Sequence, residues 1–268
     1  YNCDISNQSK IFEIIDYEKP DMIIHLAAQA GVRYSLENPQ AYFESNLQGF
    51  FNILEACRIF EINKLIFASS SSVYGNNKRD YFSENDFVDN PLNFYAASKK
   101  SNELMAYSYS NLYKIIIVGL RFFTVYGPFG RPDMSYYKFT NNILNGKYIN
   151  VFGKGEMYRD FTYVDDITNG IFSLIETINT KFSESSVPYN IFNIGNNNPV
   201  KLTYFISLIE KALGIKAKKN YLDFQQGEAI KTAANISKIQ KFLNFNPTTK
   251  IEDGIPIFVK WFKEYHNL

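Results

Sequence analysis

The sequence predicts an α/β protein: a doubly wound parallel sheet followed by a smaller, mixed α/β lobe. Three short apolar runs, 21–28, 64–69 and 114–123, are bounded and rich in β-branched residues, as strands buried on both faces are. Longer segments with helical periodicity separate these runs. Strands that alternate with helices in this way are typical of a parallel sheet with helical crossovers.

Each further element has its own signal. The helix after the first strand begins with Asn38 as its N-cap and Pro39 at its first position. A second helix is expected over 92–113, between the second and third strands. After Gly127 the alternation of strands and helices becomes less regular. We expect a loop and helix over 127–147, then a strand, turn and helix over 149–176, and a strand over 189–196. The basic segment 216–220 is expected to be a solvated turn, and 255–265 an amphipathic helix.

Composition narrows the class of protein. The 268 residues are 46% hydrophobic and 21% charged, which is ordinary for a soluble globular chain with a full core. A formal charge of +1 gives no electrostatic reason to expect nucleic acid or an anionic membrane as a partner. No apolar run approaches the roughly 20 residues of a membrane span, and no signal peptide is recognised. Cys3 and Cys57 form neither a disulfide framework nor a metal-ligand spacing, which favours the cytoplasm and predicts no metal.

A tyrosine and a lysine four residues apart are the first candidates for chemistry. The chain has 20 tyrosines, and a lysine follows four residues after both Tyr74 and Tyr95. Tyr74 begins YGNNK, whose glycine and asparagines are typical of a turn. Tyr95 begins YAASKKSNELMAY, which favours a helix, so that Tyr95 and Lys99 share one helix face.

An ammonium group beside a phenol changes what the phenol can do. A free tyrosine has a pKa near ~10 and is a poor base at neutral pH. A neighbouring cation favours the phenolate, and a pKa lower by about 3 units requires roughly 4 kcal/mol of differential interaction. The alternative is an exposed helical pair without a role.

Hydroxyl side chains precede this helix. The segment SSSSVYG (69–75) ends the second strand, and ligands bind at the carboxyl ends of strands in parallel sheets. A serine run alone is also typical of a polar loop. The succession of strand, serine cluster, VYG and a helical Y-x-x-x-K resembles the extended short-chain dehydrogenase/reductase family, the nucleotide-sugar epimerases and dehydratases. The motifs LRFFTVYGP (120–128) and YRDFTYVDDI (158–167) extend the resemblance over essentially the whole chain.

The resemblance implies a Rossmann-like domain that binds NAD and a lobe that binds a nucleotide sugar. It assigns 1–127, with a contribution from about 149–176, to the NAD-binding domain and 128–268 mainly to the sugar-nucleotide lobe. The family's glycine-rich turn for the pyrophosphate has no match, because GKG at 153–155 lies in the second lobe. We therefore expect the first βαβ unit to be missing from this chain.

The family's roles transfer residue by residue. By resemblance, Tyr95 is the proton-relaying base, Lys99 holds the nicotinamide ribose and acidifies Tyr95, and Ser70 hydrogen-bonds a sugar hydroxyl. Further cofactor contacts implied in the same way are Asp4 and Ile5 beside the adenine, Leu26, Ala27, Ala28 and Gln29 after the first strand, Asn46 as their brace, Ser69, and Phe122 near the nicotinamide. His25 falls inside a strand, so we expect a packed histidine without a catalytic role.

The serine cluster selects a branch of the family. Dehydratases similar to this chain carry Thr-Asp-Glu at the positions of Ser70, Ser71 and Ser72, and decarboxylating members usually carry Thr-Ser-Glu. Serines alone bind and orient a sugar but supply no carboxylate, which favours oxidation and re-reduction at one carbon, as in an epimerase. The segments 25–39 and 127–139 are similar to signatures of UDP-glucuronate 4-epimerases, with Phe129 where tryptophan is commoner.

Several residues are candidates for the substrate. Arginine pairs well with carboxylates and phosphates, so Arg33 and Arg131 are expected near the sugar carboxylate or the diphosphate, unless each pairs with a surface acid. The remaining contacts implied by the resemblance are Ser71, Ser72 and Thr124 to the sugar, Ile149, Val151 and Phe152 against uracil, Arg159 to the diphosphate, and Gln225 and Glu228 to the ribose or phosphate.

The expected function is NAD-dependent C4 epimerisation of a UDP-sugar, with UDP-glucuronate to UDP-galacturonate as the favoured reaction. The alternatives are an epimerase of a neutral or N-acetylated UDP-hexose, a decarboxylating relative, and a non-catalytic UDP-binding module. The resemblance also implies a homodimer that associates through the helices at 39–60 and 93–113, and a place in polysaccharide biosynthesis.

Overall fold

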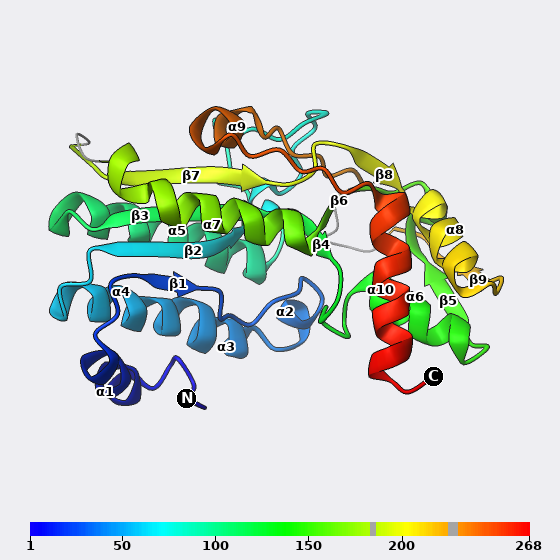
Figure 1. The fold of residues 1–268 in the computed structure, drawn as a ribbon, viewed down its shortest axis with the longest axis horizontal. Helices are drawn as coiled ribbons and strands as arrows, with labels where there is room; N and C mark the ends of the chain where they lie inside the picture. The colour runs from blue at the N-terminus through cyan, green and yellow to red at the C-terminus, as the bar shows by residue number, and fades with distance from the viewer. Residues whose placement is uncertain (183–185, 225–229) are drawn as a thin grey trace. The chain divides into compact units, whose positions relative to one another are not determined.

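The protein is described here by a computed structural model of residues 1–182, 186–224 and 230–268 (Figure 1). The chain divides into two compact units, each assembled from separate segments. Unit 1 comprises Tyr1–Asn77, Glu84–Phe122 and Ile175–Asn193, and unit 2 comprises Lys78–Ser83, Phe123–Leu174 and Ile194–Leu268. The later segment that joins unit 1 is Ile175–Asn193, because its strand hydrogen-bonds to the sheet of unit 1.

Unit 1 is built on a four-stranded sheet. The strands β1 (Ile23–His25), β2 (Lys64–Ser70), β3 (Ile116–Phe122) and β7 (Tyr189–Ile194) are hydrogen-bonded in that order, as Figure 1 shows. β2 is parallel to both β1 and β3. Successive side chains of β2 are fully buried, so both faces of this strand are covered. The predicted α/β class and parallel sheet are confirmed, although the first strand is shorter than the run 21–28.

Helices cover one face of this sheet through a shared apolar core. The core joins α1 (Gln8–Glu18), α4 (Gly49–Ile59) and α5 (Phe94–Tyr113) to side chains of β2, β3 and β7. α5 begins two residues later than the predicted 92 because Asn93 caps it: its Oδ1 accepts a hydrogen bond from the Ala96 amide at 2.9 Å.

The crossover from β1 to β2 is interrupted. After the short α2 (Tyr34–Glu37), Asn38 caps α3 (Pro39–Tyr42), as predicted, by accepting from the Ala41 amide at 3.3 Å. The chain then widens into a π-helical segment, η1 (Phe43–Gln48), before it continues as α4. Such π segments inside α-helices are frequent at functional sites.

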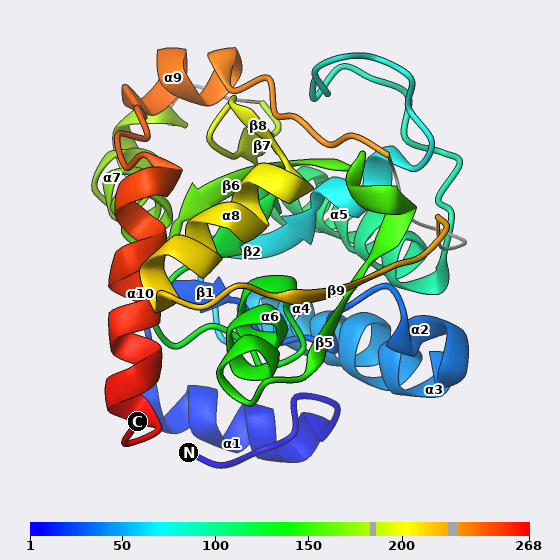
Figure 2. The ribbon, with the colours of Figure 1, turned by 90° about the vertical axis from the view of Figure 1, so that its right-hand side faces the viewer.

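Unit 2 has its own core and two small sheets. One sheet orders β4 (Thr124–Tyr126), β6 (Tyr158–Tyr163) and β8 (Pro199–Lys201), and the other pairs β5 (Tyr148–Val151) with β9 (Lys218–Tyr221). β9 replaces the turn predicted at 216–220. The helices of the unit 2 core are α6 (Ser135–Leu144), α8 (Leu202–Leu213) and α10 (Ile251–Tyr265), and Figure 2 shows α8 beside α10.

The remaining elements are short or lie outside these cores. They are η2 (Ser71–Tyr74), η3 (Phe152–Gly155), α7 (Val164–Lys181) and α9 (Ser237–Leu243). None of the helices in the described parts of the chain is both long and apolar enough to cross a membrane. The same residues contain no group of three His, Cys, Asp or Glu side chains that could hold a metal ion.

Candidate active site

Lys99 lies at the carboxyl end of a strand, on the first turns of α5. Its side chain is buried, at 3% exposure for the residue, and its Nζ donates to the Ala68 carbonyl of β2 at 2.8 Å. Burial lowers the pKa of Lys99 to about 8. The ammonium group is therefore held beside the start of the serine segment 69–72, with one carbonyl oxygen as a partner.

Tyr95 occupies the same helix face one turn earlier, because residues four apart in a helix are neighbours. Its side chain is half-buried, and its ring meets the ring of Tyr42 edge-on at 5.9 Å. Tyr42 is itself fixed by hydrogen bonds from its hydroxyl to the carbonyls of Ala30 and Gly31. Packing thus orients the phenol of Tyr95 without burying it.

The serine segment is a compact hydroxyl cluster. Ser70 ends β2 and caps η2, where its Oγ accepts from the Ser72 amide at 3.2 Å and from the Ser72 hydroxyl at 2.8 Å. Ser71 and Ser72 are half-buried. The Ser69 hydroxyl instead donates to Glu103 inside the protein at 2.6 Å. Any contact of Ser69 with a cofactor would therefore rely on its backbone.

Asn46 joins the segment after β1 to α5. Its Oδ1 accepts from the Gln29 amide at 2.8 Å, while its Nδ2 donates to the Gln29 carbonyl at 3.0 Å and to Ser98 Oγ at 2.9 Å. Asn102 donates to the Asn46 carbonyl at 2.7 Å. Asn46 lies in η1 and is 1% exposed. The π-helical segment thus brings its side chain to both Gln29 and Ser98.

The segment after β1 leaves apolar surface open. Leu26 is 54% exposed and Ala27 is also exposed, whereas Ala28 is half-buried. These residues follow the carboxyl end of a parallel strand, where ligands bind in α/β sheets. His25, just before them, packs against Phe50, and burial, followed by the charge of Lys99, lowers its pKa to about 3.

The start of the chain is held by α4. Asn52 Nδ2 donates to the carbonyls of Ile5 and Ser6 at 2.9 and 3.0 Å. The exposed carboxylate of Asp4 accepts from the Ser6 amide at 2.9 Å, and hydrogen bonds from Ser6 lower the pKa of Asp4. Phe122, the last residue of β3, is half-buried.

The arginines predicted near the substrate are at the surface. Arg33 is exposed at the start of α2. Arg131 forms an ion pair with Asp133 at 3.3 Å, and both side chains are about half exposed. Thr124, half-buried, is the first residue of β4.

Two of the residues predicted to lie against uracil have buried side chains. Ile149 and Val151 alternate with exposed residues on β5, and both are 0% exposed within the core of unit 2. Phe152 is half-buried, and Arg159 donates to the carbonyls of Tyr158 and Ile230 at 2.8 and 3.1 Å. The predicted contacts Gln225 and Glu228 lie outside the described residues.

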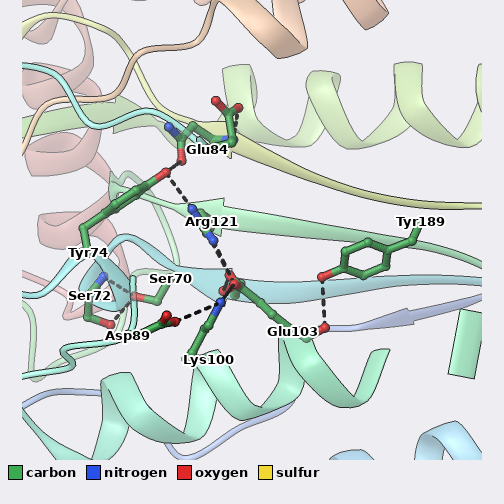
Figure 3. Close-up of polar contacts among 11 residues, drawn as sticks. Ser70, Ser72, Tyr74, Glu84, Asp89, Lys100, Glu103, Arg121 and Tyr189 are labelled. Atoms are coloured by element: carbon green, nitrogen blue, oxygen red, sulfur yellow. Dashed lines mark hydrogen bonds and ion pairs between the residues drawn. The ribbon is translucent and has the colours of Figure 1, made fainter. Parts of the chain in front are cut away.

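A buried charged pair beside the serine segment was not predicted from the sequence (Figure 3). Arg121 on β3 donates to both carboxylate oxygens of Glu103 on α5, with both distances 2.8 Å. Arg121 also donates to the hydroxyl of Tyr74 at 2.9 Å. Burial disfavours its charge, but the bonds and charges of Glu103 and Tyr74 outweigh burial and raise the pKa of Arg121. Glu103 lies one helical turn beyond Lys99 on α5. This spacing of four residues is the sequence signal that could have identified Glu103 as a neighbour of the site.

The arrangement combines a half-exposed phenol, a buried ammonium group and a hydroxyl cluster at the end of a central strand. The carboxylate of Glu103 is engaged by Ser69 and by the two hydrogen bonds from Arg121. Such a site can hold a sugar hydroxyl and move a proton at one atom, and serines occupy positions 70–72, so that these three positions supply no carboxylate for elimination.

Comparisons with known proteins place this geometry in a family. Protein CapI of Staphylococcus aureus is 49% identical over 98% of this chain and 81% of its own length. A probable UDP-glucuronate 4-epimerase of Rhizobium meliloti is 41% identical over 97% of this chain and 80% of its own length. The crystal structure of UDP-glucuronic acid 4-epimerase from Bacillus cereus, in complex with UDP-glucuronic acid and NAD, has a TM-score of 0.86 at 34% identity and covers 98% of this chain and 79% of that chain.

These similarities agree with the resemblance found in the sequence motifs. Residues 1–195 also match the model of the NAD dependent epimerase/dehydratase family. This match spans the serine segment, α5 and all strands of the unit 1 sheet. The chain belongs to the NAD dependent epimerase/dehydratase family.

Proposed function

We propose that this protein is an isomerase that interconverts UDP-glucuronate and UDP-galacturonate at C4, with NAD as cofactor, through a transient 4-keto sugar. The observation that carries the proposal is the hydroxyl cluster of Ser70, Ser71 and Ser72, which has no carboxylate, beside the face of α5 that carries Tyr95 and Lys99. The likeness to UDP-glucuronate 4-epimerases supports the choice of substrate.

Tyr95, Lys99 and Ser70 divide the proton chemistry. The phenolate of Tyr95 accepts the proton of the C4 hydroxyl, and the phenol returns it when the ketone is reduced. The Lys99 ammonium favours the phenolate by its charge and is held in place by the Ala68 carbonyl. Ser70, whose Oγ already accepts from Ser72, donates its own proton to the sugar oxygen.

The described residues of unit 1 fit the nicotinamide half of a dinucleotide. Leu26 and Ala27 leave open apolar surface at the carboxyl end of β1, and Asn46 fixes the following Gln29. Lys99 supplies a cation at the end of the neighbouring strand. If bound there, NAD⁺ would supply the acceptor for the hydride that leaves C4 of the sugar, and NADH would supply the donor for its re-reduction.

The glucuronate carboxylate needs its own restraint. The 4-keto form of this sugar is a β-keto acid, which loses CO₂ when its C–C bond aligns with the ketone π system. Ser71, Ser72 and Thr124 are proposed to hold the carboxylate out of that alignment. Arg33, Arg131 and Arg159 are proposed contacts of the carboxylate or the diphosphate, and Phe152 of the uracil.

Product analysis tests the proposal directly. The full-length protein is incubated with NAD⁺ and, separately, with UDP-glucuronate, UDP-glucose and UDP-N-acetylglucosamine, and the products are identified by NMR. We expect UDP-galacturonate from UDP-glucuronate and little conversion of the neutral sugars. Tyr95→Phe is expected to lower kcat by about 10²–10⁴-fold, because the proton relay is lost while the ring packing against Tyr42 remains.

Other products would overturn the assignment in different ways. Faster conversion of a neutral sugar would make the protein an epimerase of UDP-hexoses. A 4-keto pentose as the main product would indicate a decarboxylating enzyme. UDP binding without NAD⁺ binding or turnover would leave a non-catalytic UDP-binding module.

We also propose a homodimer. Its support is exposed apolar surface on the two helices expected at the interface: Phe51 and Ile59 on α4, and Leu104, Tyr107 and Leu112 on α5, are each 41–63% exposed. Analytical ultracentrifugation should show a dimer that Leu104→Lys with Leu112→Lys converts to a monomer. A wild-type monomer at micromolar concentration would refute this.

The cellular setting is proposed on chemical grounds. Cys3 and Cys57 are free thiols in the structure, which favours a reducing compartment such as the cytoplasm. UDP-activated uronates are donors for glycosyl transfer, so we place the product upstream of polysaccharide assembly. Fractionation of cells that express the tagged protein would test the cytoplasmic location. Loss of galacturonate from cell polymers after gene deletion would test the role in polysaccharide assembly.

A further inference from the structure

The proposed reaction needs two separate segments in a fixed relation. Ser70 ends β2 and Ser72 lies in η2, whereas Tyr95 and Lys99 lie on α5. A long loop connects η2 to α5 in the chain. A shift of about 1 Å between reacting groups costs up to about 10²-fold in rate. The structure should therefore contain a rigid link between η2 and α5.

Arg121 provides such a link, as Figure 3 shows. One side of its guanidinium forms two parallel hydrogen bonds with Glu103, and Nη1 donates to the hydroxyl of Tyr74. The guanidinium also lies over the Tyr74 ring, 4.8 Å from its centroid. Glu103 belongs to α5, and Tyr74 is the last residue of η2. A single side chain of β3 thus bridges both segments.

The α5 side of the bridge is closely restrained. Glu103 accepts from Arg121 and from Ser69, whose hydroxyl lies 2.6 Å away, and it lies one helical turn beyond Lys99. The Tyr189 hydroxyl of β7 donates to the Glu103 carbonyl at 3.0 Å, and Lys100 lies 3.9 Å from the carboxylate. Both charged partners of the pair are 3% exposed. The face of α5 that carries Lys99 is therefore tied to three strands.

The η2 side is restrained through Tyr74. Its hydroxyl accepts from Arg121 and donates to Asn193 Oδ1 on β7 at 2.6 Å. The backbone amide of Asn193 in turn donates to Glu84 Oε1 at 2.8 Å. Ser72 lies two residues before Tyr74 and is bonded to Ser70. Movement of the Tyr74 hydroxyl would thus carry the serine cluster with it.

Stability alone does not account for this pair. Replacing a buried ion pair with apolar residues of similar volume is often neutral or stabilising, because the charges no longer have to be desolvated. The bidentate geometry of Arg121, by contrast, fixes both the distance and the angle between its guanidinium and the Glu103 carboxylate. A point charge or an apolar contact does not fix both.

We propose that Arg121 is a positioning residue for the reaction: through Glu103 and Tyr74 it fixes the serine cluster relative to the face of α5 that carries Tyr95 and Lys99. The inference rests on the proposed function, since it concerns the geometry of that site. The partners of Arg121 in this role are Glu103 and Tyr74, and we assign it no contact of its own with substrate or cofactor.

The test compares three variants of the full-length protein with a matched control. Arg121→Lys keeps the charge but not the two-pronged pair, Tyr74→Phe removes only the hydroxyl, and Arg121→Met with Glu103→Leu replaces the pair by apolar side chains. The control is Arg58→Lys, because Arg58 forms the same two-pronged pair with Glu55, at 2.9 and 2.8 Å, on the outside of α4.

We expect kcat to fall about 10–100-fold in Arg121→Lys and in the apolar double variant, and about 3–10-fold in Tyr74→Phe. The KM for the UDP-sugar should stay within about threefold, since substrate contacts remain, and Arg58→Lys should retain the wild-type kcat. Tyr74→Phe leaves both charges paired, so it provides a variant that folds even where Arg121→Lys does not.

A second measurement separates this inference from the proposed function. Amide hydrogen exchange of 69–75 should accelerate in Arg121→Lys and Tyr74→Phe but not in Arg58→Lys, whether or not the wild type epimerises any UDP-sugar. Unchanged exchange with kcat within about twofold of wild type would overturn the positioning role. So would a kcat that falls only in proportion to the folded fraction seen in thermal unfolding.

Discussion

At the scale of single residues, Lys99 shows how function and stability oppose each other. Its ammonium is buried, and burial lowers its pKa from 10.5 to about 8. Between about pH 8 and pH 10.5, Lys99 is protonated in the unfolded chain but largely deprotonated in the folded chain. The free energy of unfolding therefore rises with pH across this range. Below pH 8 both states are charged, and the folded state carries the full cost of desolvation.

Lys99→Met should therefore stabilise the cofactor-free protein while it removes activity. Relief of desolvation is worth roughly 3 kcal/mol at pH 7, and the orphaned Ala68 carbonyl costs about 1–2 kcal/mol, so unfolding should become about 1–2 kcal/mol less favourable. Urea unfolding measures the first effect, and product NMR measures the loss of turnover. Lys10→Met, at an exposed pair on α1, is the control and should change neither. A loss of stability in Lys99→Met would contradict the prediction.

Ser72 offers a test of how the carboxylate is restrained. Its hydroxyl donates to Ser70 at 2.8 Å and is half-buried. Ser72→Ala should raise the share of 4-keto pentose among the products of UDP-glucuronate, because the β-keto acid is held less firmly. Product NMR measures this share, and Ser101→Ala, whose hydroxyl bonds only along α5 to Ala97 in the described structure, serves as the control. An unchanged share would exclude Ser72 from this role.

The sequence was informative about residues where the signal is local. The spacing of Tyr95 and Lys99 predicts a shared helix face, and both lie on α5. The Arg121 bridge escaped prediction because Arg121 is 18 residues from Glu103 and 47 from Tyr74, and no periodicity relates such positions. Ile149 and Val151 were assigned to a ligand by resemblance, although the alternation along β5 already predicts that they share a face.

At the scale of elements, η1 is the least predictable and the most consequential. Apolar periodicity predicts one continuous helix after Asn38, and no propensity marks a π-helical segment. The wider turn places Asn46 between Gln29 and Ser98, where its amide bonds to both. The turn predicted at 216–220 was wrong for a related reason: β9 pairs with the distant β5, and its basic residues do not show that partner.

Asn46→Ala should weaken both the fold of unit 1 and its affinity for NAD⁺. The substitution leaves the Gln29 amide and carbonyl without their side-chain partner, at a cost of about 2–3 kcal/mol in the free energy of unfolding. Urea unfolding and calorimetric titration with NAD⁺ measure the two effects. Asn111→Ala, on the exposed side of α5, should leave both unchanged. Wild-type NAD⁺ affinity in Asn46→Ala would show that the brace does not serve the cofactor.

At the scale of the whole molecule, one tryptophan reports on one unit. Trp261 lies on α10 in unit 2, and its ring is 5.3 Å from the ring of Phe129 and 5.9 Å from that of Phe258. Phe129 precedes Arg131, a proposed substrate contact, by two residues. The proposed contacts of NAD⁺, in contrast, belong to unit 1.

Titration with UDP should therefore change the fluorescence of Trp261, whereas NAD⁺ alone should change it little after correction for absorption. The experiment needs no label, because the chain has a single tryptophan. Trp261→Phe should abolish the signal while calorimetry still detects UDP binding. An equal response to both ligands would show that the two sets of contacts are not divided between the units as proposed.

The segmented make-up of unit 1 has a consequence during synthesis. Its last strand, β7, leaves the ribosome only after Phe123–Leu174 of unit 2 has been translated. Until then β3 is paired with β2 but not with β7, so the nascent sheet presents unsatisfied backbone groups along its β3 edge. Such long-range closure slows folding and exposes the chain to misassembly, so the newborn protein should depend on molecular chaperones more than its size suggests.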